Sequence, residues 1–326
     1  MMKIEIPYYE DNTRISNSAI GWYLSKGPKY LRGMLDGVEK KLSAPQLEKG
    51  TMIHEYILQP DIFWSDYKIA DYKVPTTEKQ KEFCRLYNES LELLDDDKLS
   101  KAYKQVYVTD KMSDDIILVK AKKMYEEYKS YINDLSDNKM KMITWTDYRM
   151  LETIKKNIEE HKAASVLLDN QDYECHNEFH INWEWYCKST DYIVPCKSLL
   201  DRVKIDHINK KIILIDLKTT SSLYDFRHSV ETFGYFRQMA YYSMALTWYF
   251  KDLGFDIEDY DLEIYIVAID TSTCEIRVFN MLEDKELLNQ SHIIVSALSD
   301  ISYHLKNNIW EHTRSYYEGN GVEQLS

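Results

Sequence analysis

The sequence predicts an α/β (α+β) fold in which helices flank a central mixed β-sheet. Up to residue 168, apolar residues recur at helical spacing, whereas after Asp169 they alternate with polar residues as in strands. The second half then alternates strands with helices. We predict strands at 178–187, 199–208, 211–217, 262–268 and 275–280, and helices at 233–250 and 284–306.

The N-terminal part is predicted to be helical. Ser16 is placed to cap a helix through Leu24, Pro28 to start another, and the pair 36–37 is a turn signal. A further helix is predicted over 45–58. Residues 47, 50, 54 and 58 lie three or four positions apart in it, so we expect His54 to share the apolar, inward face.

From about 61 to 137 the composition is strongly polar and helical, with mixed charges and few strand signals, so we predict a helical insertion. One long amphipathic helix is predicted over 145–168. The predicted organisation is therefore an N-terminal helical part at 1–60, an insertion at 61–140 and the core at 141–326.

Within the predicted sheet, residues 178–187 alternate, which places Phe179, Ile181, Trp183 and Trp185 on one face. The dipeptide 209–210 is a hairpin signal between the next two strands. We therefore expect the three strands from 178 to 217 to be consecutive neighbours.

The composition excludes several classes. The chain has 326 residues, and its proportions of hydrophobic and charged residues are those of an ordinary globular protein and not of a disordered protein or a fibre. Its net charge of −13 excludes a passive, histone-like DNA coat. Its five cysteines are scattered without a C-x-x-C pair, so neither a disulfide framework nor a zinc ribbon is expected. No stretch approaches the ~18 apolar residues of a membrane helix, and no secretory signal opens the sequence. We expect a soluble, cytoplasmic protein.

The strongest chemical signal is a pair of acids on neighbouring strands. Asp201 directly follows the apolar pair at 199–200. Asp216 directly follows the aliphatic run 212–215, and Lys218 comes two residues later. Residues two apart on a strand share a face, so Asp216 and Lys218 project together, within reach of Asp201. Two poorly solvated carboxylates repel each other unless a cation lies between them. Magnesium suits these oxygen ligands, and Lys218 would then orient a water or stabilise charge on a phosphate.

An acid two residues before a lysine is also common by chance in this charged chain, as at 66–68, 71–73, 96–98, 127–129 and 137–139. A surface ion pair at a strand end is therefore the alternative interpretation. Only Asp216 ends a four-residue aliphatic run with another acid-bearing strand before it.

Three further features favour a site. Glu178 begins the preceding strand, Gln238 and Tyr242 share one helix face, and His54 adds an imidazole. Each has a structural alternative, namely a solvated glutamate, a helix-surface pair and a hydrogen-bonded core histidine.

Taken in order, the motifs resemble the PD-(D/E)XK nucleases, and within them the exonuclease VIII (RecE-like) branch of phage and prophage recombination exonucleases. The resemblance covers most of the chain. It rests on Tyr9, 15–19, Pro28-x-Tyr30, 50–54, 58–60, Glu178, Asp201, Asp216-Leu217-Lys218-Thr219-Thr220 and Gly234-Tyr235-x-x-Gln238-x-x-x-Tyr242. Leu200 stands where the family name has proline, and the late cysteine cluster of iron–sulfur relatives is missing. No iron–sulfur cluster is therefore expected.

The resemblance implies roles for these residues. Asp201, Asp216, the Leu217 carbonyl and His54 would hold Mg²⁺, with Mn²⁺ as the alternative ion. Lys218 would activate the attacking water, with Asp201, Asp216 and Glu178 as its catalytic partners. Glu178 would help to position water or DNA, and Gln238, Tyr242, Thr219 and Thr220 would contact DNA.

The implied function is a magnesium-dependent 5′ to 3′ exonuclease. It would act on double-stranded DNA ends and leave 3′ strands for recombination, with a single-strand annealing protein as partner, in a bacterial or phage-infected cell. The resemblance also implies a homo-oligomer such as a tetrameric ring, and no membrane association. The alternatives are an endonuclease of the same superfamily and a non-catalytic DNA-binding or phage structural protein on the same scaffold. Lys218 and both aspartates are present, which disfavours the non-catalytic alternative.

Overall fold

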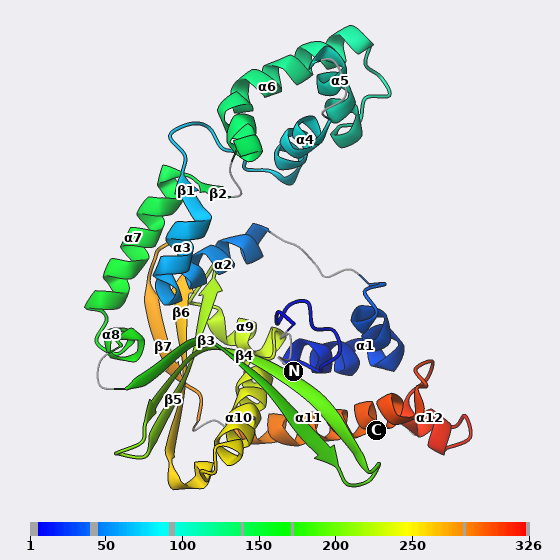
Figure 1. The fold of residues 1–326 in the computed structure, drawn as a ribbon, viewed down its shortest axis with the longest axis vertical. Coiled ribbons are helices and arrows are strands. Elements are labelled where there is room, and N and C mark those ends of the chain that lie inside the picture. Colours follow the sequence, from blue (N-terminus) through cyan, green and yellow to red (C-terminus); the bar gives the residue numbers. More distant parts are fainter. Residues whose placement is uncertain are drawn as a thin grey trace, which may run out of the picture. The chain divides into compact units, whose positions relative to one another are not determined.

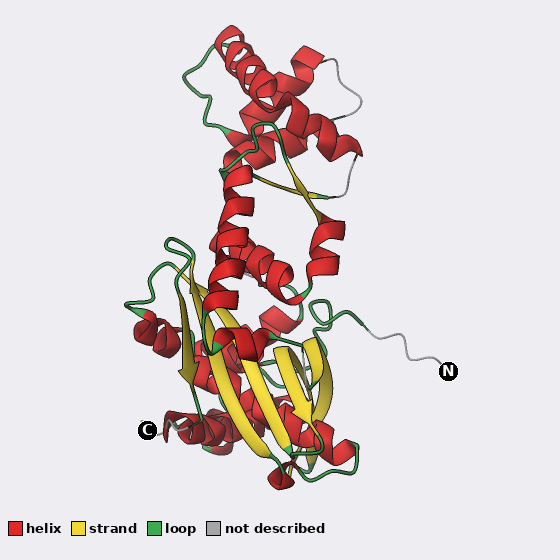
Figure 2. Ribbon diagram, turned by 90° about the vertical axis from the view of Figure 1, so that its left-hand side faces the viewer, coloured by secondary structure: helices red, strands yellow, loops and turns green. Residues whose placement is uncertain are grey.

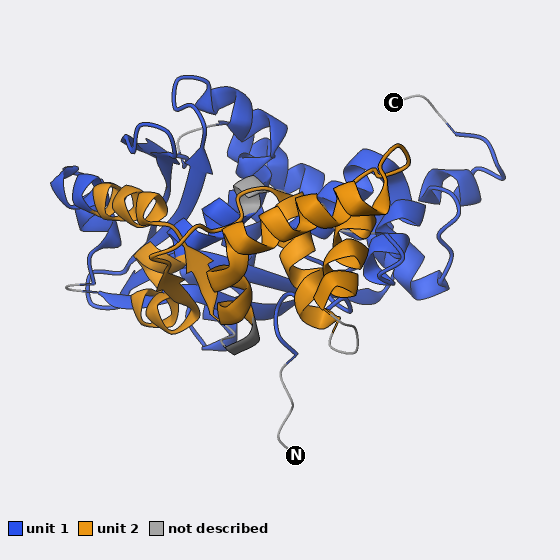
Figure 3. Ribbon diagram, turned by 90° about the horizontal axis from the view of Figure 1, so that it is seen from above, with its two compact units in different colours: residues 1–54, 156–326 blue, residues 55–155 orange. Residues whose placement is uncertain are grey.

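The computed structural model describes residues 6–39, 45–90, 95–137, 140–170, 173–282 and 285–323. The chain forms two compact units, shown in different colours in Figure 3. The first comprises Met1–His54 and Lys156–Ser326, and the second comprises Glu55–Lys155. The predicted insertion at 61–140 lies within the second unit.

The first unit is built on one five-stranded mixed sheet. Its strands, labelled in Figure 1 and drawn in yellow in Figure 2, follow the order β3-β4-β5-β6-β7. The pair β5–β6 is parallel and the other neighbouring pairs are antiparallel. The predicted mixed sheet flanked by helices is therefore confirmed. The strands are β3 (Glu174–Cys187), β4 (Tyr192–Asp206), β5 (Lys211–Thr220), β6 (Asp261–Asp270) and β7 (Ile276–Asn280).

Strand β5 lies at the centre of this sheet because its sequence suits burial on both faces. Residues 212–217 are all buried, as expected for a strand with a parallel neighbour inside an α/β layer. Helices α9 (Phe226–Thr232) and α10 (Tyr235–Asp252) and the short helix η1 (Ile257–Asp259) connect β5 to β6. Helix α10 and the later helix α11 (Lys285–Asn307) pack on β3 and β4 and on each other. Sheet and helices share one apolar core.

Strand β4 begins at Tyr192, well before the predicted start at residue 199. Pro195 lowers the strand propensity of this stretch, because proline has no N–H to donate. The stretch is nevertheless a strand because it pairs with β3 from Tyr192 onward, and the N-terminal segment adds a single bridge on its other edge. Ile15 donates its N–H to the Pro195 carbonyl (2.8 Å), and the Lys197 N–H donates to the Ile15 carbonyl (2.8 Å).

The predicted single helix at 145–168 is wrong. Helix α7 (Trp145–Glu160) ends before a separate helix α8 (Ala164–Leu168). The break lies at His161, whose Nδ1 accepts the N–H groups of Ala163 (3.3 Å) and Ala164 (3.1 Å) and so caps α8. Buried Arg202 and Lys204 of β4 donate to the C-terminal carbonyls of α8, where positive charge is favourable.

Helix α1 (Asn17–Leu35) confirms the predicted N-cap, because Ser16 Oγ accepts the Ala19 N–H at 3.2 Å. The two helices predicted here form one element with an interruption at Gly27, whose φ of 79° lies in the left-handed region. Helix α2 spans Pro45–Leu58, as predicted. The short helix α12 (Arg314–Glu318) follows α11 and was not predicted.

The second unit is mainly helical, as its composition predicts. Phe83, Leu99, Ile117 and Tyr128 belong to a separate apolar cluster of its own helices α4, α5 and α6. A short parallel pair, β1 with β2, was not predicted. The elements of this unit are α3 (Pro60–Asp66), β1 (Tyr67–Ile69), α4 (Glu78–Glu89), α5 (Asp95–Val106), α6 (Asp114–Asp137) and β2 (Lys141–Ile143). Within the described residues, none of the helices has the length and apolar character needed to cross a membrane.

Candidate functional site

The two predicted aspartates lie next to each other on β4 and β5. Arg202 pairs with Ile215, so Asp201 and Asp216 occupy the following positions on adjacent antiparallel strands. The backbone N–H of Leu217 donates to Asp201 Oδ2 at 2.8 Å, which ties the Asp201 side chain to β5. The hairpin therefore brings both carboxylates to one place.

Three possible metal ligands converge beside this hairpin. One ligand atom each from His54, Glu178 and Asp201 lies within 4.8 Å of the others, and His54 Nδ1 is 3.5 Å from Asp201 Oδ2. Helix α2 brings His54 close to β5, where a Cβ on Gly50 would lie only 3.1 Å from Thr219 Oγ1. The two aspartates of the hairpin and the ligands His54 and Glu178 therefore lie together in the first unit.

Glu178 has an unusual backbone. Its φ of 48° lies in the left-handed region, which costs a non-glycine residue about 1 kcal/mol or more. The β3–β4 pairing skips Glu178 and Asp201, which lie between the pairs Asn177–Arg202 and Phe179–Leu200, and the register is the same on both sides. The period-two pattern gave no sign of this distortion. Strained backbone at a residue that joins a ligand cluster is typical of functional sites.

Asp216 is fully buried and lies between Lys218 and Gln238. Its Oδ1 accepts a hydrogen bond from Gln238 Nε2 at 3.2 Å, and its Oδ2 contacts Lys218 Nζ as an ion pair. Oδ2 receives no hydrogen bond of normal geometry from the described residues. Gln238 Nε2 also donates to the Tyr242 hydroxyl at 2.8 Å. The two residues predicted to share a helix face are therefore bonded to each other, and Gln238 links them to Asp216.

The electrostatics of the site favour binding of a cation. Burial raises the pKa of Asp216 to about 6, with Asp201 adding to the rise and Lys218 opposing it. Burial also raises the pKa of Asp201. Burial by itself would lower the pKa of Lys218, but Asp216 and Asp201 outweigh it, so the pKa is raised and the ammonium form is favoured. Two crowded carboxylates are the arrangement that a divalent cation relieves.

The residues present fit a divalent cation. They offer an imidazole, carboxylates and a buried carboxylate oxygen that lacks an ordinary hydrogen bond. Oxygen-rich sets of this kind suit Mg²⁺ or Mn²⁺. The residues that would hold the ion are His54, Glu178, Asp201 and Asp216. The ligand role predicted for the Leu217 carbonyl stays a prediction.

The two predicted threonines differ in their surroundings. Thr219 lies against α2 at Gly50, next to the ligand cluster. The Thr220 hydroxyl donates to the Ser222 carbonyl at 3.1 Å and accepts the Ser222 N–H at 3.2 Å, which makes a turn after β5. The DNA-binding role of both residues stays a prediction.

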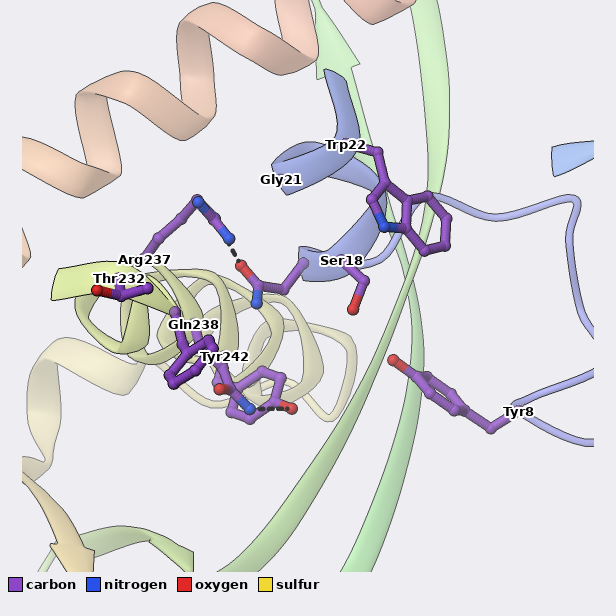
Figure 4. A pocket seen from close by; sticks show the side chains of 10 residues that line it. Tyr8, Ser18, Gly21, Trp22, Thr232, Arg237, Gln238 and Tyr242 are labelled. Carbon is purple, nitrogen blue, oxygen red and sulfur yellow. Dashed lines mark hydrogen bonds between the residues drawn. The ribbon is translucent and has the colours of Figure 1, made fainter. Parts of the chain in front are cut away.

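Gln238, which donates a hydrogen bond to Asp216, also lines a pocket together with Tyr242 (Figure 4). It has a volume of about 370 Å³, and none of the described residues that line it is acidic, although the chain as a whole carries a charge of −13. Hydrogen-bond donors and aromatic rings provide the lining. The lining residues are Tyr8, Asn17, Ser18, Gly21, Trp22, Thr232, Phe233, Arg237, Gln238 and Tyr242.

Arg237 supplies the positive charge of this pocket. Its Nε donates to Asn17 Oδ1 at 3.0 Å, and no carboxylate of the described residues pairs with it. Two glycines make room for the guanidinium, because a Cβ at Gly21 or Gly234 would lie 2.8 or 2.9 Å from its nitrogens. Sequence reasoning missed this residue. The signal was an arginine in the first turn of a helix, where the dipole disfavours positive charge.

Comparisons with known proteins add little here. No protein-family model and no curated protein matches the chain. Among solved structures, the chain is similar to an inferred exonuclease of Eubacterium rectale, with a TM-score of 0.48 and 13% identity over 100% of this chain and 96% of that chain. It is also similar to the protein SSO0001, with a TM-score of 0.27 and 13% identity over 76% of this chain and 85% of that chain. Similarity at this level carries no information on activity.

Proposed function

We propose that the protein is a divalent-metal-dependent deoxyribonuclease of the PD-(D/E)XK type that degrades duplex DNA from its ends, 5′ to 3′. One observation carries the proposal. The carboxylates of Asp201 and Asp216 meet beside Lys218, with His54 and Glu178 completing a ligand set. The resemblance to the exonuclease VIII branch implies the requirement for an end and the strand polarity.

Phosphodiester hydrolysis joins a water oxygen to phosphorus and breaks the bond from phosphorus to one sugar oxygen, which gains a proton. A divalent cation bound here would supply polarisation of the phosphate and acidification of water. Lys218 is largely buried and, because of the carboxylates, charged, so it donates hydrogen bonds to the water or the phosphate oxygens. Gln238 holds Asp216 in place through their hydrogen bond.

The pocket beside the site supports a polyanionic substrate. Its Arg237 guanidinium has no carboxylate partner among the described residues, and Ser18, Thr232 and Tyr8 add hydroxyls (Figure 4). A phosphate group of the DNA backbone would provide the missing negative charge, because guanidinium and hydroxyl donors are the usual phosphate contacts. A strand bound in this pocket would continue from the reacting phosphate, which supports the proposal.

The test is incubation of linear and closed circular duplex DNA with the protein, with and without magnesium. We expect loss of linear DNA only, and only with magnesium. Loss of both forms would indicate an endonuclease of the same superfamily. Survival of both forms would overturn the nuclease proposal and leave a DNA-binding protein.

Two variants test whether this site carries out the cleavage. Asp216→Ala and Lys218→Ala should each abolish cleavage while the protein stays folded, because each change removes a charged group of the site and none of the apolar side chains of the core. Asp216→Ala should also weaken calcium binding measured by calorimetry, whereas Lys218→Ala should not. Near-normal cleavage by either variant would place the active site elsewhere.

A further inference from the structure

Lys218 has two kinds of neighbour. Its Nζ contacts the carboxylate of Asp216, and it also lies 5.1 Å from the centroid of the Tyr235 ring. A cation at this distance from an aromatic face is attracted by the ring's quadrupole. The carboxylate and the ring together therefore determine where the ammonium group lies.

These two neighbours respond differently to a bound divalent cation. Asp216 would then share its negative charge between the cation and the ammonium group of Lys218, and the two positive charges would repel each other. Lysine is a point charge on a flexible four-carbon stem, so a weakened ion pair leaves its head group free to move. The Tyr235 ring carries no formal charge for the cation to neutralise, and its attraction for the ammonium group is retained.

The backbone and two aromatic neighbours hold the Tyr235 ring in place. Gly234 precedes it as the N-cap of α10 with a left-handed φ of 65°. The ring stacks on Phe233 at 5.9 Å with an interplanar angle of 27°, and it meets Phe226 at 6.0 Å and 40°. Within the described residues the Tyr235 hydroxyl makes no hydrogen bond, so the aromatic ring is the part that contacts its surroundings.

We propose that Tyr235 is a positioning residue for Lys218, and that its ring holds the ammonium group at the reacting phosphate once Asp216 is engaged by a cation. The proposal depends on the nuclease function proposed above, because the role is defined by the lysine that serves cleavage. It requires an electron-rich ring and not the hydroxyl. It adds to the site a residue that touches neither the cation nor the DNA.

The first experiment compares Tyr235→Leu with Tyr235→Phe under single-turnover conditions, on linear duplex DNA with saturating magnesium. Tyr235→Leu should slow cleavage by about 3- to 30-fold, the range expected for loss of one cation–π contact. Tyr235→Phe should restore most of the lost rate. Tyr224→Leu is the matched control, because this tyrosine is 95% exposed and lies outside the site.

A second measurement separates positioning from packing. Calcium binding by calorimetry should stay the same in Tyr235→Leu, because the ring does not hold the cation. The melting temperature of the metal-free protein should fall only slightly, because leucine fills part of the space in which the Tyr235 ring packs against the core. Incorporation of phenylalanine with one, two and three ring fluorines at position 235 lowers the electron density of the ring at nearly constant size. The cleavage rate should fall stepwise with each fluorine, as the quadrupole weakens.

The outcomes distinguish this proposal from the function on which it depends. Wild-type protein that leaves DNA intact overturns both. A wild type that cleaves, together with a trifluorinated variant as fast as Tyr235→Phe, overturns the role of Tyr235 alone. Loss of rate in Tyr235→Leu with parallel losses of calcium binding and melting temperature also overturns it, because that pattern is one of general disruption.

Discussion

The backbone N–H of Leu217 donates a hydrogen bond to Asp201 Oδ2 at 2.8 Å, across the β4–β5 hairpin. This bond fixes the Asp201 carboxylate through the backbone of the strand that carries Asp216 and Lys218. The protein itself therefore orients this side chain. Preorganisation of this kind lowers the entropic cost of binding a cation.

Asp201→Asn tests this relationship. The asparagine carbonyl can still accept the Leu217 N–H, but the negative charge is lost. We expect calcium affinity to fall by at least about tenfold in calorimetry. The free energy of unfolding of the metal-free protein should stay within about 1 kcal/mol, because a carboxylate whose pKa is raised by burial is removed. Unchanged calcium affinity would remove Asp201 from the ligand set.

His54→Ala separates a metal ligand from a core histidine. The His54 side chain is 24% exposed and lies in the ligand cluster, so the variant should need more magnesium for half-maximal cleavage with little change in metal-free melting temperature. A core role predicts the reverse, because deletion of a buried, hydrogen-bonded ring costs about 1 to 3 kcal/mol. His292→Ala, at an exposed position on α11, is the control.

Arg237→Ala should weaken DNA binding without removing the metal site. We expect the KM for duplex DNA to rise by roughly 10-fold or more, as for the loss of a charge-assisted phosphate contact, and calcium affinity to stay the same. Arg237→Lys should recover part of the loss, because lysine keeps the charge but not the forked donors. Arg227→Ala on α9, an exposed arginine outside the pocket, should have a normal KM. A normal KM in Arg237→Ala would rule out the pocket as a phosphate site.

His304 predicts a pH dependence of stability away from the site. It is fully buried on α11, Nδ1 is 2.7 Å from the Ile309 carbonyl, and Nε2 has no hydrogen-bond partner in the described residues. Burial lowers its pKa below the ordinary 6.5, although the bond to Ile309 and the charge of Asp300 oppose the shift. Below about pH 6.5 the unfolded chain therefore binds a proton that the folded chain does not, and stability falls as pH falls.

The measurement is urea unfolding of wild type and His304→Asn at about pH 7.5 and about pH 5.5. The asparagine amide can still donate to the Ile309 carbonyl but does not titrate. Wild type should lose about 1 kcal/mol more than the variant over this interval. Equal losses in both proteins would show that His304 does not bring about the acid destabilisation.

Local pattern was enough to predict most of the sheet and the acids on it. The strand carrying Asp216 and the helix over Pro45–Leu58 follow from aliphatic runs and from three- and four-residue spacing, which are properties of neighbouring residues. The break at His161 did not follow, because a side chain that caps the next helix competes with a continuous amphipathic pattern. The early start of β4 did not follow either, because pairing with β3 outweighs the low strand propensity of Pro195.

The sequence by itself determined which groups are available: two aspartates and a lysine on adjacent strands, a histidine on an apolar helix face and a Gln–Tyr pair one helical turn apart. The tertiary structure alone decided that Glu178 joins the ligand cluster through a left-handed backbone and that Tyr235 faces Lys218. It also decided that Arg237 lines a pocket whose lining, in the described part of the chain, holds no acidic residue. Periodicity specifies which face of an element a residue occupies. Distances between residues far apart in the chain depend on how the elements pack, which no local pattern contains.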